Sequence, residues 1–104
     1  MITPQLIKPK SIAVVGASDN LGKPGGKVLY NIKNGNFDGE LYAVNPKHER
    51  IQGVPTFKSI SDLPQTDLAI LAIPAKLSLP AVKGLLEEKG TKAVIVLSAG
   101  FSEM

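Results

Sequence analysis

The stretch SIAVVGASDNLGKPGG, residues 11–26, decides the fold, because a short apolar run breaks there into a glycine-rich loop just before an amphipathic segment. A strand, a loop and a helix in that order bring the free N–H groups and the positive dipole end of the helix beside the loop. Glycines let an anion approach the backbone closely. We therefore expect a phosphate-binding loop between Gly16 and Gly25, with contacts added by the Ser18 hydroxyl and the Lys23 ammonium.

The glycines of this loop do not follow the dinucleotide-binding pattern G-x-G-x-x-G. Ala17 stands at the position of its second glycine. The alternative interpretation is that the glycines only make a tight turn. The strand before the loop and the helix after it favour the phosphate-binding interpretation.

Composition bounds the class of protein. The chain has 104 residues, 43% hydrophobic and 20% charged, which is typical of one folded domain. We expect a cytoplasmic protein without membrane contact, because no apolar run approaches the roughly 18 residues of a membrane span and no secretory signal is visible. The lack of cysteine excludes disulfides and thiolate metal sites. A net charge of only +3 and 5% aromatic residues argue against nucleic acid as a partner.

Strand and helix patterns alternate along the chain. Near-continuous apolar runs predict strands that are covered on both faces of a parallel sheet; these runs are residues 11–15, 41–44, 68–73 and 93–97. Residues 54–57 are expected to add a brief edge strand, and residues 59–63 a single helical turn capped by Ser59. The alternation predicts an α/β fold in a single domain, with a doubly wound parallel sheet in the strand order 3-2-1-4-5.

Two longer helices are expected between these strands. The first follows Pro24, carries Val28, Leu29 and Ile32 at helical spacing, and ends at Asn34-Gly35. The second has an apolar stripe of Val82, Leu85 and Leu86, with Pro80 in its first turn and Gly90 as terminator. The chain stops seven residues after Leu97, where another helix should begin. We therefore expect residues 1–104 to be the N-terminal domain of a longer polypeptide, the alternative being a short natural protein.

The end of the second strand distinguishes between cofactors. NAD-binding domains place an acidic residue there for the ribose hydroxyls, but this chain has the neutral Asn45 followed by Lys47, His48 and Arg50. A cationic segment suits a ribose that carries a phosphate, as in NADP or coenzyme A. We expect Lys47 to contact that phosphate, the alternative being a solvated loop lysine. His48, the only histidine, is interpreted as an exposed loop residue rather than a general base or a metal ligand.

Two later loops should complete the rim of the site, because they follow strands at the same sheet edge. Pro74 with Ala75 offers a small apolar surface for an adenine or pantetheine group. Ser98 and Gly100 offer a hydroxyl and a close backbone approach. The alternative is that Pro74 only ends a strand and that Gly100 only turns the chain.

Four motifs in this order resemble the N-terminal coenzyme A-binding domain of NDP-forming acyl-CoA synthetases and related protein lysine acetyltransferases, whose fold succinyl-CoA synthetase alpha subunits share. The motifs are residues 9–18, 44–47, 67–74 and 98–103. The resemblance implies a Rossmann-like domain that binds coenzyme A or acyl-CoA. The residues that it implies for the contact are Gly16, Ala17, Ser18, Gly22, Lys23, Lys47, Pro74, Ser98 and Ala99.

By the same resemblance, the full enzymes interconvert an acyl-CoA, NDP and phosphate with the free acid, coenzyme A and NTP. A phosphorylated histidine of another domain carries that chemistry. We therefore expect this chain to bind coenzyme A, to work with downstream synthetase domains or a partner subunit, and to catalyse nothing alone. In the acetyltransferase relatives the corresponding part is a regulatory sensor. Two alternatives are the NADP-binding domain of an oxidoreductase and a ligand-free interaction domain.

Overall fold

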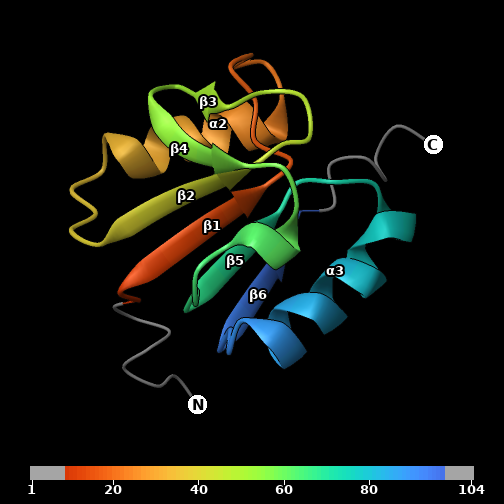
Figure 1. The fold of residues 1–104 in the computed structure, drawn as a ribbon. Coiled ribbons are helices and arrows are strands. Elements are labelled where there is room, and N and C mark those ends of the chain that lie inside the picture. Colours follow the sequence, from red (N-terminus) through yellow and green to blue (C-terminus); the bar gives the residue numbers. More distant parts are fainter. Residues whose placement is uncertain (1–8, 98–104) are drawn as a thin grey trace.

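A six-stranded sheet forms the centre of the computed structural model, which describes residues 9–97 (Figure 1). The strand order across the sheet is β3-β4-β2-β1-β5-β6. The strands are β1 (Ser11–Val15), β2 (Glu40–Val44), β3 (Arg50–Ile51), β4 (Val54–Phe57), β5 (Leu68–Leu71) and β6 (Ala93–Val96). Every pairing is parallel except that of β3 with β4, which is antiparallel.

Helices cover both faces of this sheet (Figure 1). Helix α2 (Pro24–Lys33) packs on one face through Leu29, which is fully buried with Val14 and Ala43. Helix α3 (Ala75–Glu88) and the short 3-10 helix η1 (Ile60–Asp62) lie on the opposite face, over a separate apolar cluster. The fold is therefore a doubly wound, Rossmann-like α/β domain. Within the described residues, no helix is long and apolar enough to cross a membrane.

The burial of the central strand β1 explains why four of its five residues, Ile12 to Val15, are apolar. All five of its residues are buried. Ala13 and Val15 belong to the cluster under α3, whereas Val14 belongs to the cluster under α2. A strand covered on both faces has no solvent-facing side chains, so the polar alternation of a one-sided strand is absent.

The predicted strand order is confirmed. Taken in chain order, the parallel strands β1, β2, β4, β5 and β6 lie as 3-2-1-4-5. The two-residue strand β3 was not predicted, because no apolar run marks it in the sequence. The predicted strands at residues 68–73 and 93–97 end earlier, at Leu71 and Val96. Ladder hydrogen bonds nevertheless continue one residue further, from Ala72 N to Val15 O at 2.8 Å and from Leu97 N to Leu71 O at 2.9 Å.

The start of α3 differs from the prediction. The helix begins directly after Pro74, so Pro80 lies inside it and not in its first turn. The Ser78 hydroxyl donates to the Pro74 carbonyl at 3.3 Å, which fixes this extra turn. Ser78, Ala81 and Leu85 form the buried face of the helix. Ser78 and Ala81 are small and not strongly apolar, so the sequence does not indicate that this first part is helical.

The other predicted helix ends are close to those observed. Helix α2 ends at Lys33 with Asn34 as its cap, and Gly90 adopts a left-handed φ of 58° just beyond the end of α3. Ser59 does precede the short helical turn, but its hydroxyl makes no cap bond to the backbone. That hydroxyl contacts Ser61 Oγ and Asp62 Oδ2 instead.

Candidate functional site

A cleft of about 460 Å³ opens at the carboxyl ends of the central strands. Its wall combines the loop after β1, the start of α2, the loop after β2 and the first residue after β5. The lining residues are Gly16, Ala17, Ser18, Lys23, Pro24, Gly25, Asn45, Pro46, Lys47, His48 and Ala72. This is the edge at which doubly wound sheets bind ligands.

Two glycines of the loop are required by close contacts within the chain itself. Gly16 has φ +87°, and a Cβ atom there would lie 2.4 Å from the carbonyl oxygen of Ala72. A Cβ atom at Gly25 would lie 2.0 Å from the carbonyl oxygen of Gly16. The start of α2 is thus pressed against the peptide that ends β1, in a way that no other residue type permits.

The outer part of the loop is held by hydrogen bonds of its own. Ser18 Oγ accepts from Asn20 N at 3.0 Å, and Asn20 Oδ1 accepts from Gly22 N at 2.8 Å. Lys23 N donates to the Asn20 carbonyl at 3.0 Å. These short-range bonds give the segment a defined shape, because side chains close successive small turns.

The start of α2 suits an anion. Lys23 is the N-cap residue, it caps no backbone N–H with its side chain, and the first turn holds no acidic residue. The first N–H groups of a helix have no acceptor within the helix, and they carry its positive dipole end. Pro24, the first residue of the helix, has no N–H, and Gly25, the second, lines the cleft together with Lys23.

Asn45 joins the two principal walls of the cleft. Its Nδ2 donates to the Ala17 carbonyl at 2.9 Å, and its Oδ1 accepts from Lys47 N at 2.8 Å. One amide side chain therefore ties the glycine loop to the turn that carries Lys47. An Asn-Pro pair is a known turn signal, whereas the link from Asn45 to the glycine loop has no signal in the sequence.

The cleft is cationic. Lys23, Lys47 and His48 contribute to its lining, and no carboxylate is found in that lining among the described residues. Basic groups at the mouth of a cleft, together with unpaired backbone N–H groups, attract and bind phosphate.

The structure brings most of the predicted site residues together. Gly16, Ala17, Ser18, Lys23 and Lys47 all line the one cleft. His48 is exposed, as expected for a loop residue, and it also lines the cleft.

Some predicted contacts are not part of this lining. Gly22 and Pro74 are not among the described residues that form the wall of the cleft. Ser98 and Ala99 lie outside the described residues, so their predicted contact stays a prediction.

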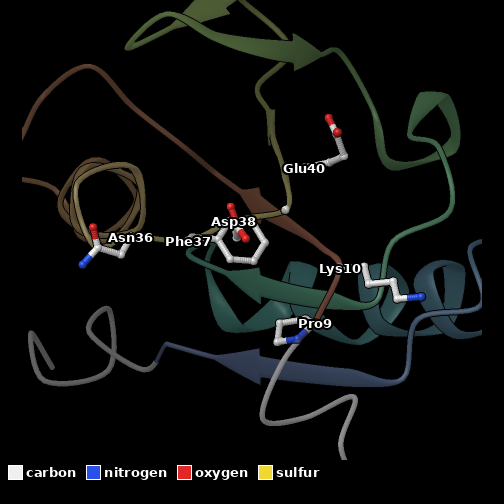
Figure 2. A pocket seen from close by; sticks show the side chains of 7 residues that line it. Pro9, Lys10, Asn36, Phe37, Asp38 and Glu40 are labelled. Atoms are coloured by element: carbon white, nitrogen blue, oxygen red, sulfur yellow. The ribbon is translucent and has the colours of Figure 1, made fainter.

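A larger hollow of about 630 Å³ lies at the opposite, amino-terminal end of the sheet. It is lined by Pro9, Lys10, Asn36, Phe37, Asp38, Gly39 and Glu40. In Figure 2 the side chains of Lys10 and Glu40, which both line this hollow, point in different directions. Only the first two residues of the motif 9–18 reach this hollow, and its charged groups are mixed in sign, so the smaller cleft is the better candidate for an anion.

Fold and cleft together define a Rossmann-like α/β domain with a basic cleft at the carboxyl edge of its sheet. The family described as CoA binding domain matches residues 10–104. The chain therefore belongs to the CoA binding domain family, which confirms the resemblance seen in the sequence.

Relatives and solved structures agree with this assignment. The chain is 43% identical over 99 residues to acetate-CoA ligase (ADP-forming) II of Archaeoglobus fulgidus, covering 94% of this chain and 15% of that protein. It is 41% identical over 98 residues to the alpha subunit of acetate-CoA ligase (ADP-forming) II of Pyrococcus furiosus, covering 91% of this chain and 21% of that protein.

A solved structure shares the fold. The dinucleotide forming acetyl-coenzyme A synthetase 1 of Ca. Korarchaeum cryptofilum, in complex with phosphate and ADP, superposes with a TM-score of 0.84 at 32% identity. The match covers 95% of this chain and 21% of that one. In each of these comparisons the chain spans about a fifth or less of the relative's length.

Proposed function

We propose that this chain binds coenzyme A, or an acyl-CoA, in the cleft at the carboxyl edge of its sheet. The observation that carries the proposal is the joining of the glycine loop and Lys47 in one cationic cleft, in a chain of the CoA binding domain family. Coenzyme A has a diphosphate and a 3'-phosphate, so it needs cationic and N–H donors at two places.

The two walls of the cleft suit these two places. The diphosphate would lie against Gly16, Ala17, Ser18 and the start of α2, where Lys23 adds a positive charge. The 3'-phosphate would lie near Lys47, at the end of β2. Gly22, Pro74, Ser98 and Ala99 stay proposed contacts on the strength of the resemblance alone.

The larger activity proposed for this chain is that of an ADP-forming acyl-CoA ligase, because the relatives compared here are named as acetate-CoA ligases that form ADP. In that activity this domain would hold the thiol carrier, and other domains or a partner subunit would make and break bonds. A relative named as an alpha subunit supports a partner subunit. The proposed compartment is the cytoplasm, which agrees with a chain that lacks cysteine.

Isothermal titration of this chain with coenzyme A, acetyl-CoA, NADP and NAD tests the proposal. We expect binding of both coenzyme A compounds and none of NAD, because the end of β2 has no acidic residue for free ribose hydroxyls. Binding of NADP in preference to coenzyme A would favour an oxidoreductase domain. No binding of any of the four would contradict the proposal.

A further inference from the structure

The hairpin between β3 and β4 turns on two residues in the left-handed region. Gln52 has φ +52° and Gly53 has φ +76°. Two-residue hairpin turns with positive φ at both positions are usually filled by Asn, Asp or Gly, because other side chains are strained there. The turn itself therefore gives no reason for a glutamine. A strained residue that persists is a sign of another constraint on that position.

The contacts of Gln52 show such a constraint. Its Nε2 donates to two carbonyls, Ser18 O and Gly26 O, both at 2.9 Å. Ser18 stands near the start of the glycine loop and Gly26 just after its end. One carboxamide thus bridges the two ends of the loop, from a hairpin more than twenty residues away in sequence.

Main-chain contacts hold the same residue in place. Gln52 N donates to Asp19 Oδ1 at 2.8 Å, so the loop also binds the hairpin in return. Lys33 Nζ donates to the Gln52 carbonyl at 2.5 Å, which attaches the hairpin to the last turn of α2. The glycine loop, the hairpin tip and both ends of α2 are therefore linked through one residue.

A second feature points the same way. The Oε1 atom of Gln52 is buried and has no hydrogen-bond partner among the described residues. A buried acceptor without a partner is unfavourable, and most are eliminated from folded proteins. Gln52 keeps this unpaired acceptor together with a strained backbone, and the two bonds that its side chain donates to the loop are the contacts that the structure shows in return.

We infer that Gln52 is a positioning residue, which clamps the glycine loop in the shape that receives the diphosphate. The inference rests on the proposed function for the identity of the ligand. Ser18 lines the cleft and has its carbonyl held by Gln52. A carbonyl held in this way is not free to turn its negative oxygen toward an incoming phosphate.

The test compares two variants that keep the turn with one matched control. Gln52→Gly accepts the positive φ and deletes the carboxamide, and Gln52→Asn suits the same backbone but is one methylene too short to bridge the two carbonyls. Thr56→Val is the control, because Thr56 donates within β4 to the Val54 carbonyl at 2.9 Å and to no loop atom that the structure describes.

Coenzyme A titration and amide hydrogen exchange of residues 16–26 in the unliganded protein are the two measurements. Both Gln52 variants should bind coenzyme A about 5- to 30-fold more weakly, as expected for two lost hydrogen bonds, and their loop amides should exchange faster. Thermal unfolding should stay close to that of the unaltered chain, because the strain is relieved. Thr56→Val should leave both the affinity and the loop exchange unchanged.

The outcomes separate the clamp from the proposed function. If the unaltered chain binds coenzyme A and both Gln52 variants bind it equally well, the clamp is wrong. If the unaltered chain does not bind coenzyme A, the proposed function is wrong, and loop exchange alone decides the clamp. Unchanged exchange in both variants would then overturn it, and faster exchange would support it.

Discussion

The two ends of the sheet differ in a way that volume alone does not reveal. The hollow at the amino-terminal end is the larger, at about 630 Å³, against about 460 Å³ for the cleft at the carboxyl end. The larger hollow mixes Lys10 with Asp38 and Glu40. The smaller cleft has Lys23, Lys47 and His48 and no carboxylate among its described lining residues.

Parallel strands account for this difference. Their carboxyl ends all meet at one edge, where the loop after β1 and the start of α2 supply N–H groups. Polar side chains then fix these loops to one another, as Asn45 does for the glycine loop. The opposite edge has close contacts too, since a Cβ atom at Gly39 would lie 2.2 Å from the Lys10 carbonyl, but none of the helices in residues 9–97 begins there. Charge and backbone polarity, more than size, identify the site.

The largest effect is expected from Gly16→Ala. The new Cβ atom would meet the Ala72 carbonyl at a positive φ, so the chain should lose about 3 kcal/mol of unfolding free energy and measurable coenzyme A binding. Chemical denaturation and titration measure the two losses.

Two further variants sharpen that experiment. Gly53→Ala has a similar φ with no atom within 4 Å of the new Cβ, so it should show the strain without the clash, about 1 kcal/mol. Gly39→Ala should reduce stability at the other end and leave the affinity of the folded protein unchanged. A loss of affinity there as large as in Gly16→Ala would break the distinction between the two ends.

A smaller effect is expected from Lys47→Ala. The loss of one charge-assisted phosphate contact should weaken coenzyme A binding by about 1.5 to 3 kcal/mol. Dephospho-coenzyme A should lose less, because it lacks the 3'-phosphate. Lys10→Ala, in the far hollow, is the matched control and should bind as the unaltered chain does. Equal losses for both ligands would disprove the role proposed for Lys47.

The smallest effect is expected from Asn45→Asp. The change removes the donor to the Ala17 carbonyl and places a negative charge in the lining of the cleft. Coenzyme A affinity should fall about tenfold. Asn36→Asp makes the same change in the far hollow, at a residue whose φ of 65° aspartate tolerates. Calorimetry should find no change for that variant, and a similar loss in both would show that net charge, not position, controls binding.

Much of this fold could be predicted from the sequence because its strands are buried on both faces. A largely apolar run such as residues 11–15 indicates a buried strand by itself, without knowledge of the strands that pair with it. The start of α3 was missed because Ser78 and Ala81, on its buried face, are not strongly apolar. Strand β3 was missed because two residues show no periodicity.

The site was predicted less completely, for a different reason. Glycine, lysine and the turn after β2 leave local signals, so Gly16, Ser18 and Lys47 could be proposed from sequence. Gln52 could not, because its bonds join positions 34 and 26 residues apart. The Gln-Gly pair between Ile51 and Val54 does indicate a turn, but nothing in it indicates what the side chain reaches.

The contact between Gly25 and the Gly16 peptide has a consequence for how a ligand enters. A Cβ atom at Gly25 would lie only 2.0 Å from the Gly16 carbonyl oxygen. Helix α2 is therefore packed too closely against the end of β1 to move further toward a bound ligand. The wall of the cleft formed by the end of β1 and the start of α2 is therefore preorganised. Binding of coenzyme A should require little rearrangement of this wall.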